Sequence, residues 1–333
     1  MNIARRSIVG AAAAVPVFAI GYARAADYNF RLPHDLPATH PLHTRTQQAA
    51  DRIRDRTGGR VAITLYPDSV LGSDVATITM LQAGTVDLFT LPGVILSSAI
   101  PMASLNGVGF AFSSYPRIWS VMDGPLGKFI AAEISRNGII PVCRIANNGF
   151  RQSTSAIRPV VEPGDFKGLK LRVPASPLST RLFQALGAET TVINYNLLYN
   201  ALKTRAVDSQ ETPLALIEVS KLYEVQTYCS LTNHMWDGYW MLANEAMWRG
   251  LPDAIRDTIA EEFDRAALEE RADLQKRDPA MRSDLAEAGL QINATETALF
   301  RRALHRAGFY NEWREKFGAK AWAVLEDAAG GLD

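Results

Sequence analysis

Two arginines, Arg151 and Arg172, stand beside predicted strands, in places where a guanidinium could hold a carboxylate. In FKGLKLRVPAS (166–176), apolar residues alternate with Lys170 and Arg172, and Pro174 closes the run, which is typical of a strand. From the strand alone, Arg172 is most simply a solvent-facing residue, because charged side chains are mostly exposed. The alternative is that it points into a cleft, where its planar fork matches a carboxylate with two parallel hydrogen bonds.

More polar and aromatic side chains follow at successive predicted strand ends. Those of interest, besides the two arginines, are Asn148, Tyr195, Thr212, Asn233, His234 and Trp236. Each one alone has an ordinary structural explanation, and Tyr195 and Trp236 are more typical of a core than of a ligand platform. Together they indicate a binding site where the chain passes between two lobes.

The common catalytic and cofactor motifs do not occur in the sequence. It contains no G-x-S-x-G, P-loop, C-x-x-C or H-E-x-x-H pattern, and NGVGF lacks the third glycine of a dinucleotide motif. His34, His40 and His43 lie close together, but no cysteine or carboxylate completes a familiar ligand set, so we interpret them as loop and helix-start residues. We therefore expect no catalytic residue, no metal and no cofactor.

The first 25 residues are predicted to be a signal peptide, with Arg5 and Arg6 before a short apolar run and A-R-A at 23–25. Both the Sec and the Tat export routes stay open. Removing Arg5, Arg6 and Arg24 changes 35 basic and 35 acidic residues to 32 and 35, a net charge of −3. That balance gives no indication of nucleic-acid binding. Cys143 and Cys229 lie in apolar runs, and we expect two buried free thiols rather than a disulfide.

Strand and helix patterns alternate through most of the chain, which predicts an α/β protein with a parallel sheet. The strand patterns are VAITLYP, VDLFTL, IIPVCRI, LKLRVP, ETTVIN and AVDSQE. One helix is expected from about Pro116 to Gly138, and a long one over 253–288, in which Pro279 is a candidate break. The long helix exceeds what one lobe needs, so it is expected to bridge two.

These motifs together resemble the DctP-type solute-binding proteins of tripartite ATP-independent periplasmic (TRAP) transporters. The similarity covers nearly the whole mature chain and includes RTGGRVAITLYPDSVLGSD, LQAGTVDL, NNGFRQST, FKGLKLRVP, LGAETTVI, YNALKTRAVDSQETPL and KLYEVQTYCSLTNH. The resemblance implies a two-lobed, type II-like periplasmic binding protein fold, with a cleft between the lobes and a long helix spanning both. The expected division is 26–149 plus about 238–277 for lobe I, and 150–237 plus about 278–333 for lobe II.

The resemblance also implies roles for particular residues. Arg172 would make the main salt bridge to the ligand carboxylate, and Arg151 would support the same end of the site. Asp74 would contribute from the first lobe, while Ser176 and Tyr195 would line the pocket.

Four positions depart from the family pattern. Thr212 stands where many members have asparagine, Ser209 replaces a glycine, Leu197 a glutamate, and Pro92 an acidic contact of sialic-acid binders. These changes argue against sialic acid.

The nearby aromatic residues Trp236, Tyr239 and Trp240 favour a smaller or less polar acid, aromatic or branched. A C4-dicarboxylate stays open, because Arg151 could bind a second carboxylate.

The resulting interpretation is a periplasmic protein that binds an organic acid and passes it to the membrane subunits of a TRAP transporter. It is not expected to be an enzyme or itself membrane-embedded. Two alternatives stay open: a periplasmic enzyme on organic acids with His234 as general base, and a ligand-sensing receptor subunit for a signalling partner.

Overall fold

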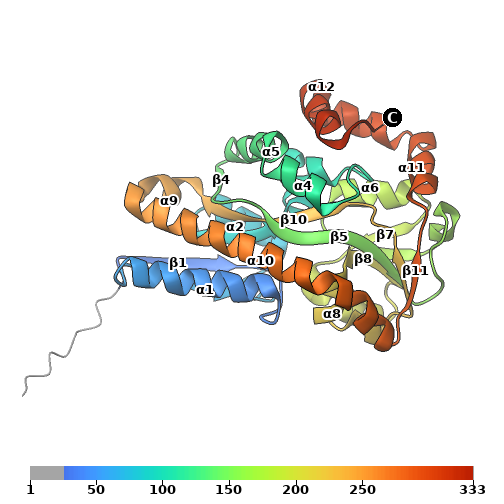
Figure 1. The fold of residues 1–333 in the computed structure, drawn as a ribbon, viewed down its shortest axis with the longest axis horizontal. Helices are drawn as coiled ribbons and strands as arrows, with labels where there is room; N and C mark the ends of the chain where they lie inside the picture. The colour runs from blue at the N-terminus through green and yellow to red at the C-terminus, as the bar shows by residue number, and fades with distance from the viewer. Residues whose placement is uncertain (1–25, 333) are drawn as a thin grey trace, which may run out of the picture.

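The first lobe is built around parallel strands that are covered by helices. The computed structural model describes residues 26–332, so the predicted signal peptide lies outside the described residues. β1 (Tyr28–Pro33) pairs in parallel with β2 (Val61–Tyr66), and His34, which follows β1, bridges in parallel to Thr90 of β3 (Leu88–Pro92). The short strand β4 (Ile139–Pro141) and the helices α1 (Pro41–Arg56), α2 (Asp74–Gln82), α3 (Gly93–Leu96) and α9 (Glu245–Gly250) complete this lobe (Figure 1).

The second lobe repeats the alternation of strand and helix. Its strands are β6 (Lys170–Val173), β7 (Glu189–Val192), β8 (Ser209–Pro213), β9 (Tyr228–Leu231) and β11 (Gln291–Ala294). Its helices include α6 (Pro177–Ala185), α7 (Leu198–Lys203) and α8 (Leu214–Val219). The α/β class and the two-lobed architecture are therefore as expected.

Two long strands carry the chain from one lobe to the other. β5 (Ala146–Ser155) and β10 (Trp236–Asn244) pair with each other in antiparallel fashion. β5 also runs antiparallel to β8 and β9, and β10 runs antiparallel to β3 and β4. The prediction of a parallel sheet is thus only partly correct, because these connecting strands enter each lobe against the direction of its own strands.

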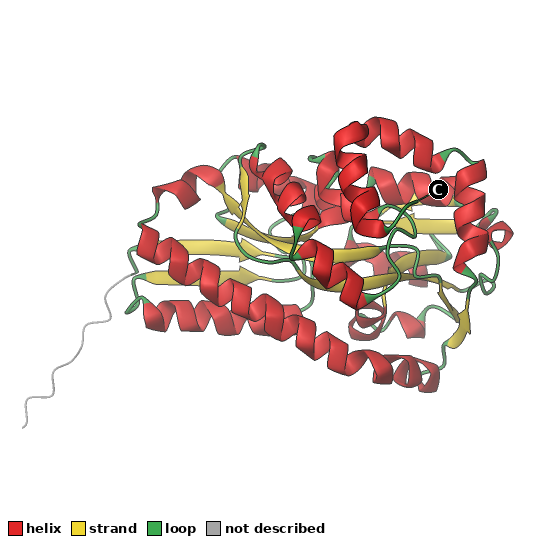
Figure 2. Cartoon of the chain, turned by 45° about the horizontal axis from the view of Figure 1, so that its top comes forward, coloured by secondary structure: helices red, strands yellow, loops and turns green. Residues whose placement is uncertain are grey.

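A single long helix, α10 (Asp253–Glu287), lies along both lobes, as expected (Figure 2). Its first half packs on α1, where Arg52 pairs with Glu262, and its second half packs on α8, where Arg277 pairs with Glu218. Pro279 lies inside the helix without ending it. No helix within residues 26–332 is long and apolar enough to cross a membrane.

The helix expected from Pro116 to Gly138 is two helices, which corrects the prediction. α4 (Tyr115–Met122) and α5 (Pro125–Ser135) meet at Gly124, whose φ of −110° and ψ of −143° are not helical. Pro125 then occupies the first position of α5, where its missing N–H costs no hydrogen bond. The turn brings the two helices so close that a Cβ on Gly127 would lie 1.8 Å from the Met122 carbonyl oxygen.

The C-terminal helices α11 (Thr297–Arg306) and α12 (Phe309–Ala329) close the fold. α12 packs on α5 and the 3-10 helix η1 (Pro101–Gly107), and also on α6 of the second lobe. The lobe limits proposed from the sequence stay a prediction. Cys143 and Cys229 are free thiols, of which Cys229 is buried and Cys143 half-buried.

We predict that Gly127→Ala destabilises the protein by about 2–3 kcal/mol, because the added methyl group overlaps backbone that cannot move without parting α4 from α5. Urea unfolding followed by circular dichroism measures this. Gly250→Ala is the matched control, since nothing lies within 4 Å of its Cβ position, and it should change the stability by less than about 0.5 kcal/mol. Equal stability of the two variants would contradict the tight junction.

Candidate functional site

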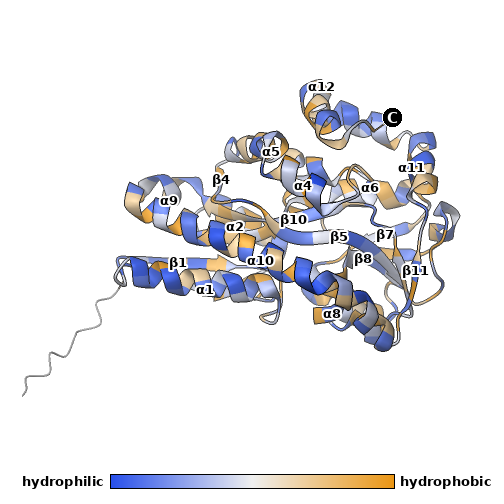
Figure 3. Ribbon diagram, in the orientation of Figure 1, coloured by the Kyte–Doolittle hydropathy of each residue, from blue (hydrophilic) through white to orange (hydrophobic). Residues whose placement is uncertain are grey.

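The strand β5 is polar and yet buried. Nine of its ten residues are buried, although Figure 3 shows much of the strand as hydrophilic. Buried polar groups are costly unless they find partners, so such a strand marks a place where polar chemistry is needed. β8 lies between β5 and β6, which places Arg151 and Arg172 on the two strands that flank it.

Arg151 is held by a buried carboxylate of the neighbouring strand. Its Nε and Nη2 donate to the two carboxylate oxygens of Glu211 at 2.5 and 3.1 Å, and its Nη1 lies 3.5 Å from Asp237 Oδ2. All three side chains are at least 97% buried. Glu211 keeps a lowered pKa because Arg151 and His234 outweigh the cost of its burial. Arg151 is therefore neutralised within the protein and is poorly placed to bind a second ligand carboxylate.

His234 extends the same network and has no free nitrogen. Nε2 lies 3.1 Å from Glu211 Oε2, and Nδ1 lies 2.8 Å from Thr232 Oγ1. With Glu211 ionised, Nε2–H donates to the carboxylate and Nδ1 accepts from the hydroxyl. Burial lowers the pKa of His234. Both ring nitrogens are occupied by protein groups, which argues against a general base at this position.

Asn148 and Asp237 lie next to Arg151, at a bulge between β5 and β10. The register shifts between Asp237 and Gly238, and Gly149 has a φ of +117°, which side chains with a Cβ rarely adopt. Asn148 Nδ2 donates to Asp237 Oδ2 at 3.4 Å, and the backbone N–H of Gly238 donates to Asp237 Oδ1 at 3.0 Å. Burial raises the pKa of Asp237 to about 6.

Arg172 is buried and is not the solvent-facing residue that the strand pattern alone suggested. Its side chain is 2% exposed, and Nε donates to the carbonyl oxygen of Ile193 at 2.8 Å. Within residues 26–332, no ion pair joins this guanidinium to a carboxylate, and Nη1 and Nη2 have no hydrogen-bond acceptor. Burial lowers the pKa of Arg172 to about 10, although Glu211 opposes the change. A buried cation with two free donor groups is suited to an anion from outside the chain.

Asp74 and Asn194 join the two lobes. Asn194, between β7 and α7, accepts from the backbone N–H of Asp74 at 3.1 Å and donates to Ser69 Oγ at 3.2 Å. Asp74 begins α2 and is 3% exposed. Burial raises its pKa to about 6, although Arg172 opposes the change. Asn194 therefore connects the two lobes through two hydrogen bonds.

Three of the predicted site residues use their polar atoms within the protein. Ser176 Oγ accepts from the backbone N–H of Ser179 and caps α6. Tyr195 donates from its hydroxyl to the Leu216 carbonyl oxygen at 3.0 Å. Trp236 donates from Nε1 to Asn147 Oδ1 and packs edge-on against Trp119. Their contribution to a ligand site would be shape rather than direct hydrogen bonds.

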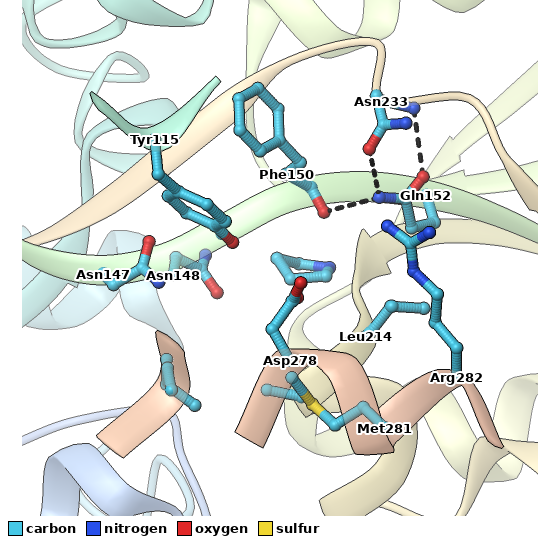
Figure 4. Close-up of a pocket in the computed structure, with 14 residues that line it drawn as sticks. Tyr115, Asn147, Asn148, Phe150, Gln152, Leu214, Asn233, Asp278, Met281 and Arg282 are labelled. Carbon is cyan, nitrogen blue, oxygen red and sulfur yellow. Dashed lines mark hydrogen bonds between the residues drawn. The ribbon is translucent and has the colours of Figure 1, made fainter. Parts of the chain in front are cut away.

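Asn233 and Asn148 line a small cavity of about 50 Å³ (Figure 4). Asn233 Oδ1 accepts from Gln152 Nε2 at 2.7 Å, and α10 contributes Asp278 and Arg282 to the lining. Thr212 lies opposite Gln152 in the β5–β8 register. Arg172 does not line this cavity, so the predicted residues fall into two groups, one around the arginines and one beside α10.

The three histidines near the N-terminus have a structural role, as expected. His40 Nδ1 accepts from the Leu42 backbone N–H and caps α1. His34 Nε2 lies 2.9 Å from His43 Nδ1. Burial lowers the pKa of His34 to about 4 and that of His40 to about 3, so both rings are neutral at pH 7.

Four residues of the site were not identified from the sequence: Glu211, Asp237, Asn194 and Asp35. Glu211 lies inside the VDSQE motif, so a buried acid beside Arg151 could have been suspected. Asp35, in the proline-rich loop after β1, is 3% exposed, and burial and the nearby Asp74 raise its pKa. Its place near Arg172 depends on contacts between distant segments, which no local pattern encodes.

Comparison with known proteins finds similarity to bacterial extracellular solute-binding proteins. The family described as bacterial extracellular solute-binding protein, family 7 (DctP), matches residues 32–313. The uncharacterized protein y4mM of Sinorhizobium fredii is 33% identical over 74% of this chain, which spans 44% of that protein's length. The 2,3-diketo-L-gulonate-binding periplasmic protein YiaO of Escherichia coli is 27% identical over 86% of this chain and 87% of its own. A TRAP periplasmic solute-binding protein of Roseobacter denitrificans with bound L-galactonate superposes with a TM-score of 0.84 at 27% identity, covering 91% of this chain and all of that one.

We predict that Asp74→Asn stabilises the ligand-free protein at pH 8, by on the order of 3 kcal/mol, and not at pH 4. The folded protein holds the Asp74 proton up to about pH 6, whereas the ordinary pKa is 3.8. The stability that this group contributes is therefore full below pH 4 and is lost as the pH rises through 6. Urea unfolding at both values measures it, with the exposed Asp55→Asn as control. A gain in the stability of Asp74→Asn that grows as the pH falls toward 4 would contradict the burial of an ionisable Asp74.

Proposed function

This chain belongs to family 7 of the bacterial extracellular solute-binding proteins and is a solute-binding protein of the TRAP type, and we propose that Arg172 is its carboxylate anchor. The ligand is a small organic acid, held between the two lobes at the carboxyl ends of their strands. Arg151 supports this end of the site through Glu211 rather than by a salt bridge of its own.

The observation that carries this proposal is the buried guanidinium of Arg172, with one hydrogen bond to the protein and no carboxylate partner among residues 26–332. A buried charge without a counterion is strongly unfavourable. A ligand carboxylate at Nη1 and Nη2 would supply both the missing charge and two hydrogen bonds. Because the site excludes water, this pair is stronger than the same pair at a surface.

The transporter would recognise the closed arrangement of the two lobes. Ligand between the lobes favours the closed form, in which Asn194 reaches both Ser69 and Asp74. The closed form then docks on the membrane subunits of a TRAP transporter, and an ion gradient drives uptake. This role places the mature chain in the periplasm, after removal of residues 1–25.

The family relatives support a role in binding rather than in catalysis. YiaO is described as a binding protein, and the Roseobacter protein has bound L-galactonate. The occupied nitrogens of His234 agree with this. We therefore propose that the chain releases its ligand unchanged.

We predict that Arg172→Ala abolishes stabilisation by every acid that binds the wild-type protein, with a loss of about 3–5 kcal/mol in binding. A thermal-shift screen of the mature chain against carboxylic acids measures this, since a ligand at 100 times its Kd adds about 2.7 kcal/mol of stability. Thr212→Ala should change only which acids bind.

Lys170→Ala is the control on the same strand, because Lys170 is exposed, and it should keep every shift. Retention of the shifts by a folded Arg172→Ala variant would rule out Arg172 as the anchor. Turnover of an acid in the same incubations would favour the enzyme alternative.

A further inference from the structure

We propose that the ligand is a polyhydroxylated monocarboxylate, such as an aldonic or uronic acid, and that Asp35 is the residue that selects it. The proposal rests on the function proposed above and adds the chemistry of the far end of the ligand. It replaces the interpretation from the sequence, which favoured a less polar, aromatic or branched acid.

Asp35 lies on the wall of lobe I that approaches Arg172 of the second lobe. It follows β1, whose extension at His34 pairs in parallel with Thr90 of β3, and the neighbouring carbonyl groups of His34 and Leu36 accept from Ser69 and Asp68. Asp35 is thus at the carboxyl edge of the lobe I strands, where ligands bind in α/β folds. Arg172 is at the corresponding edge of the second lobe, in β6.

Tyr239 belongs to the same wall. It lies opposite Pro92, the last residue of β3, and is 1% exposed. Its ring lies 6.5 Å from that of His40. Burial raises the pKa of Tyr239, and Asp35, Tyr195 and Asp237 add to the effect, so the phenol stays protonated and can donate.

The polar atoms of this wall lack partners. Within residues 26–332, Asp35 Oδ1, Tyr239 Oη and His40 Nε2 are buried without a hydrogen bond, and so is Gln210 Oε1 of the second lobe, which pairs with Arg172 in the β6–β8 register. Each buried polar group left unpaired lowers the affinity by roughly tenfold to a hundredfold. Hydroxyl groups both donate and accept, so a polyhydroxylated chain can satisfy carboxyl, phenol and amide together. An alkyl or aromatic ligand would leave them unpaired.

The charges of the site disfavour a second carboxylate on the ligand. Asp35 and Asp74 both interact electrostatically with Arg172, Asp237 lies near Asp35, and each of the three acids has a raised pKa. Arg151, the other buried cation, already pairs with Glu211 and Asp237. A dicarboxylate would thus meet acidic groups at its far end, whereas a neutral hydroxylated chain would not.

The test is isothermal titration of the mature chain with six-carbon acids that differ only in their substituents. The probes are L-galactonate, D-gluconate, hexanoate and adipate, with benzoate as the aromatic acid. We expect at least one of the two hydroxylated acids to bind 100-fold more tightly than hexanoate, adipate and benzoate. Tightest binding of adipate, benzoate or hexanoate would overturn the proposal while leaving the carboxylate anchor intact. Binding of none of the five, and of no acid in the wider screen, would instead refute the proposed function.

Two variants assign the selection to this wall. Asp35→Ala should weaken the better hydroxylated acid 10- to 100-fold and leave any measurable affinity for hexanoate within about threefold. Tyr239→Phe removes only a hydroxyl group and should weaken binding of the better hydroxylated acid about tenfold. This variant tests the proposal if Asp35→Ala does not fold. Asp55→Ala, at an exposed site 75% accessible to solvent, is the matched control and should bind as the wild type does. The role of this wall would be overturned if folded Asp35→Ala bound the hydroxylated acid with unchanged affinity. If Asp35→Ala does not fold, unchanged affinity in Tyr239→Phe would overturn it.

Discussion

The site depends on a buried guanidinium that has no carboxylate within salt-bridge distance among residues 26–332. Arg172 is 2% exposed, and its one hydrogen bond within residues 26–332 goes to a carbonyl oxygen. Desolvating a cation is expensive, and a ligand carboxylate is the simplest group that offsets this cost. Binding of a ligand carboxylate therefore stabilises the folded protein with its lobes closed. Ligand binding and lobe closure are coupled in this way.

The second arginine shows how the protein treats a cation that it does not reserve for the ligand. Arg151 is bound by Glu211 on both oxygens, and Glu211 also binds His234. This network lies where β5, β8 and β10 meet, so it fixes the strands that connect the lobes. One arginine is thus part of the scaffold and the other is left available, although both follow similar patterns in the sequence.

The alternation of strands and helices and the long helix could be predicted, because glycine, proline and helix propensity act locally, whereas the two-lobed fold was implied by the family resemblance. The break between α4 and α5 was missed, although the Gly124–Pro125 pair is a readable signal. In the site, Arg172 and Arg151 were singled out by their positions beside strands and by the family resemblance, and their roles stay predictions. Asp35 and Asn194 could not be singled out, since their roles arise from contacts between segments far apart in the chain, which a single sequence does not display.

The most direct measurement takes whichever of L-galactonate and D-gluconate binds more tightly and compares it with its own amide, by titration calorimetry on the unmodified mature chain. The two differ only in the group that would face Nη1 and Nη2 of Arg172. We expect the amide to bind at least about 100-fold more weakly, because it brings no charge to the buried guanidinium. Equal affinities would mean that Arg172 does not hold the carboxylate.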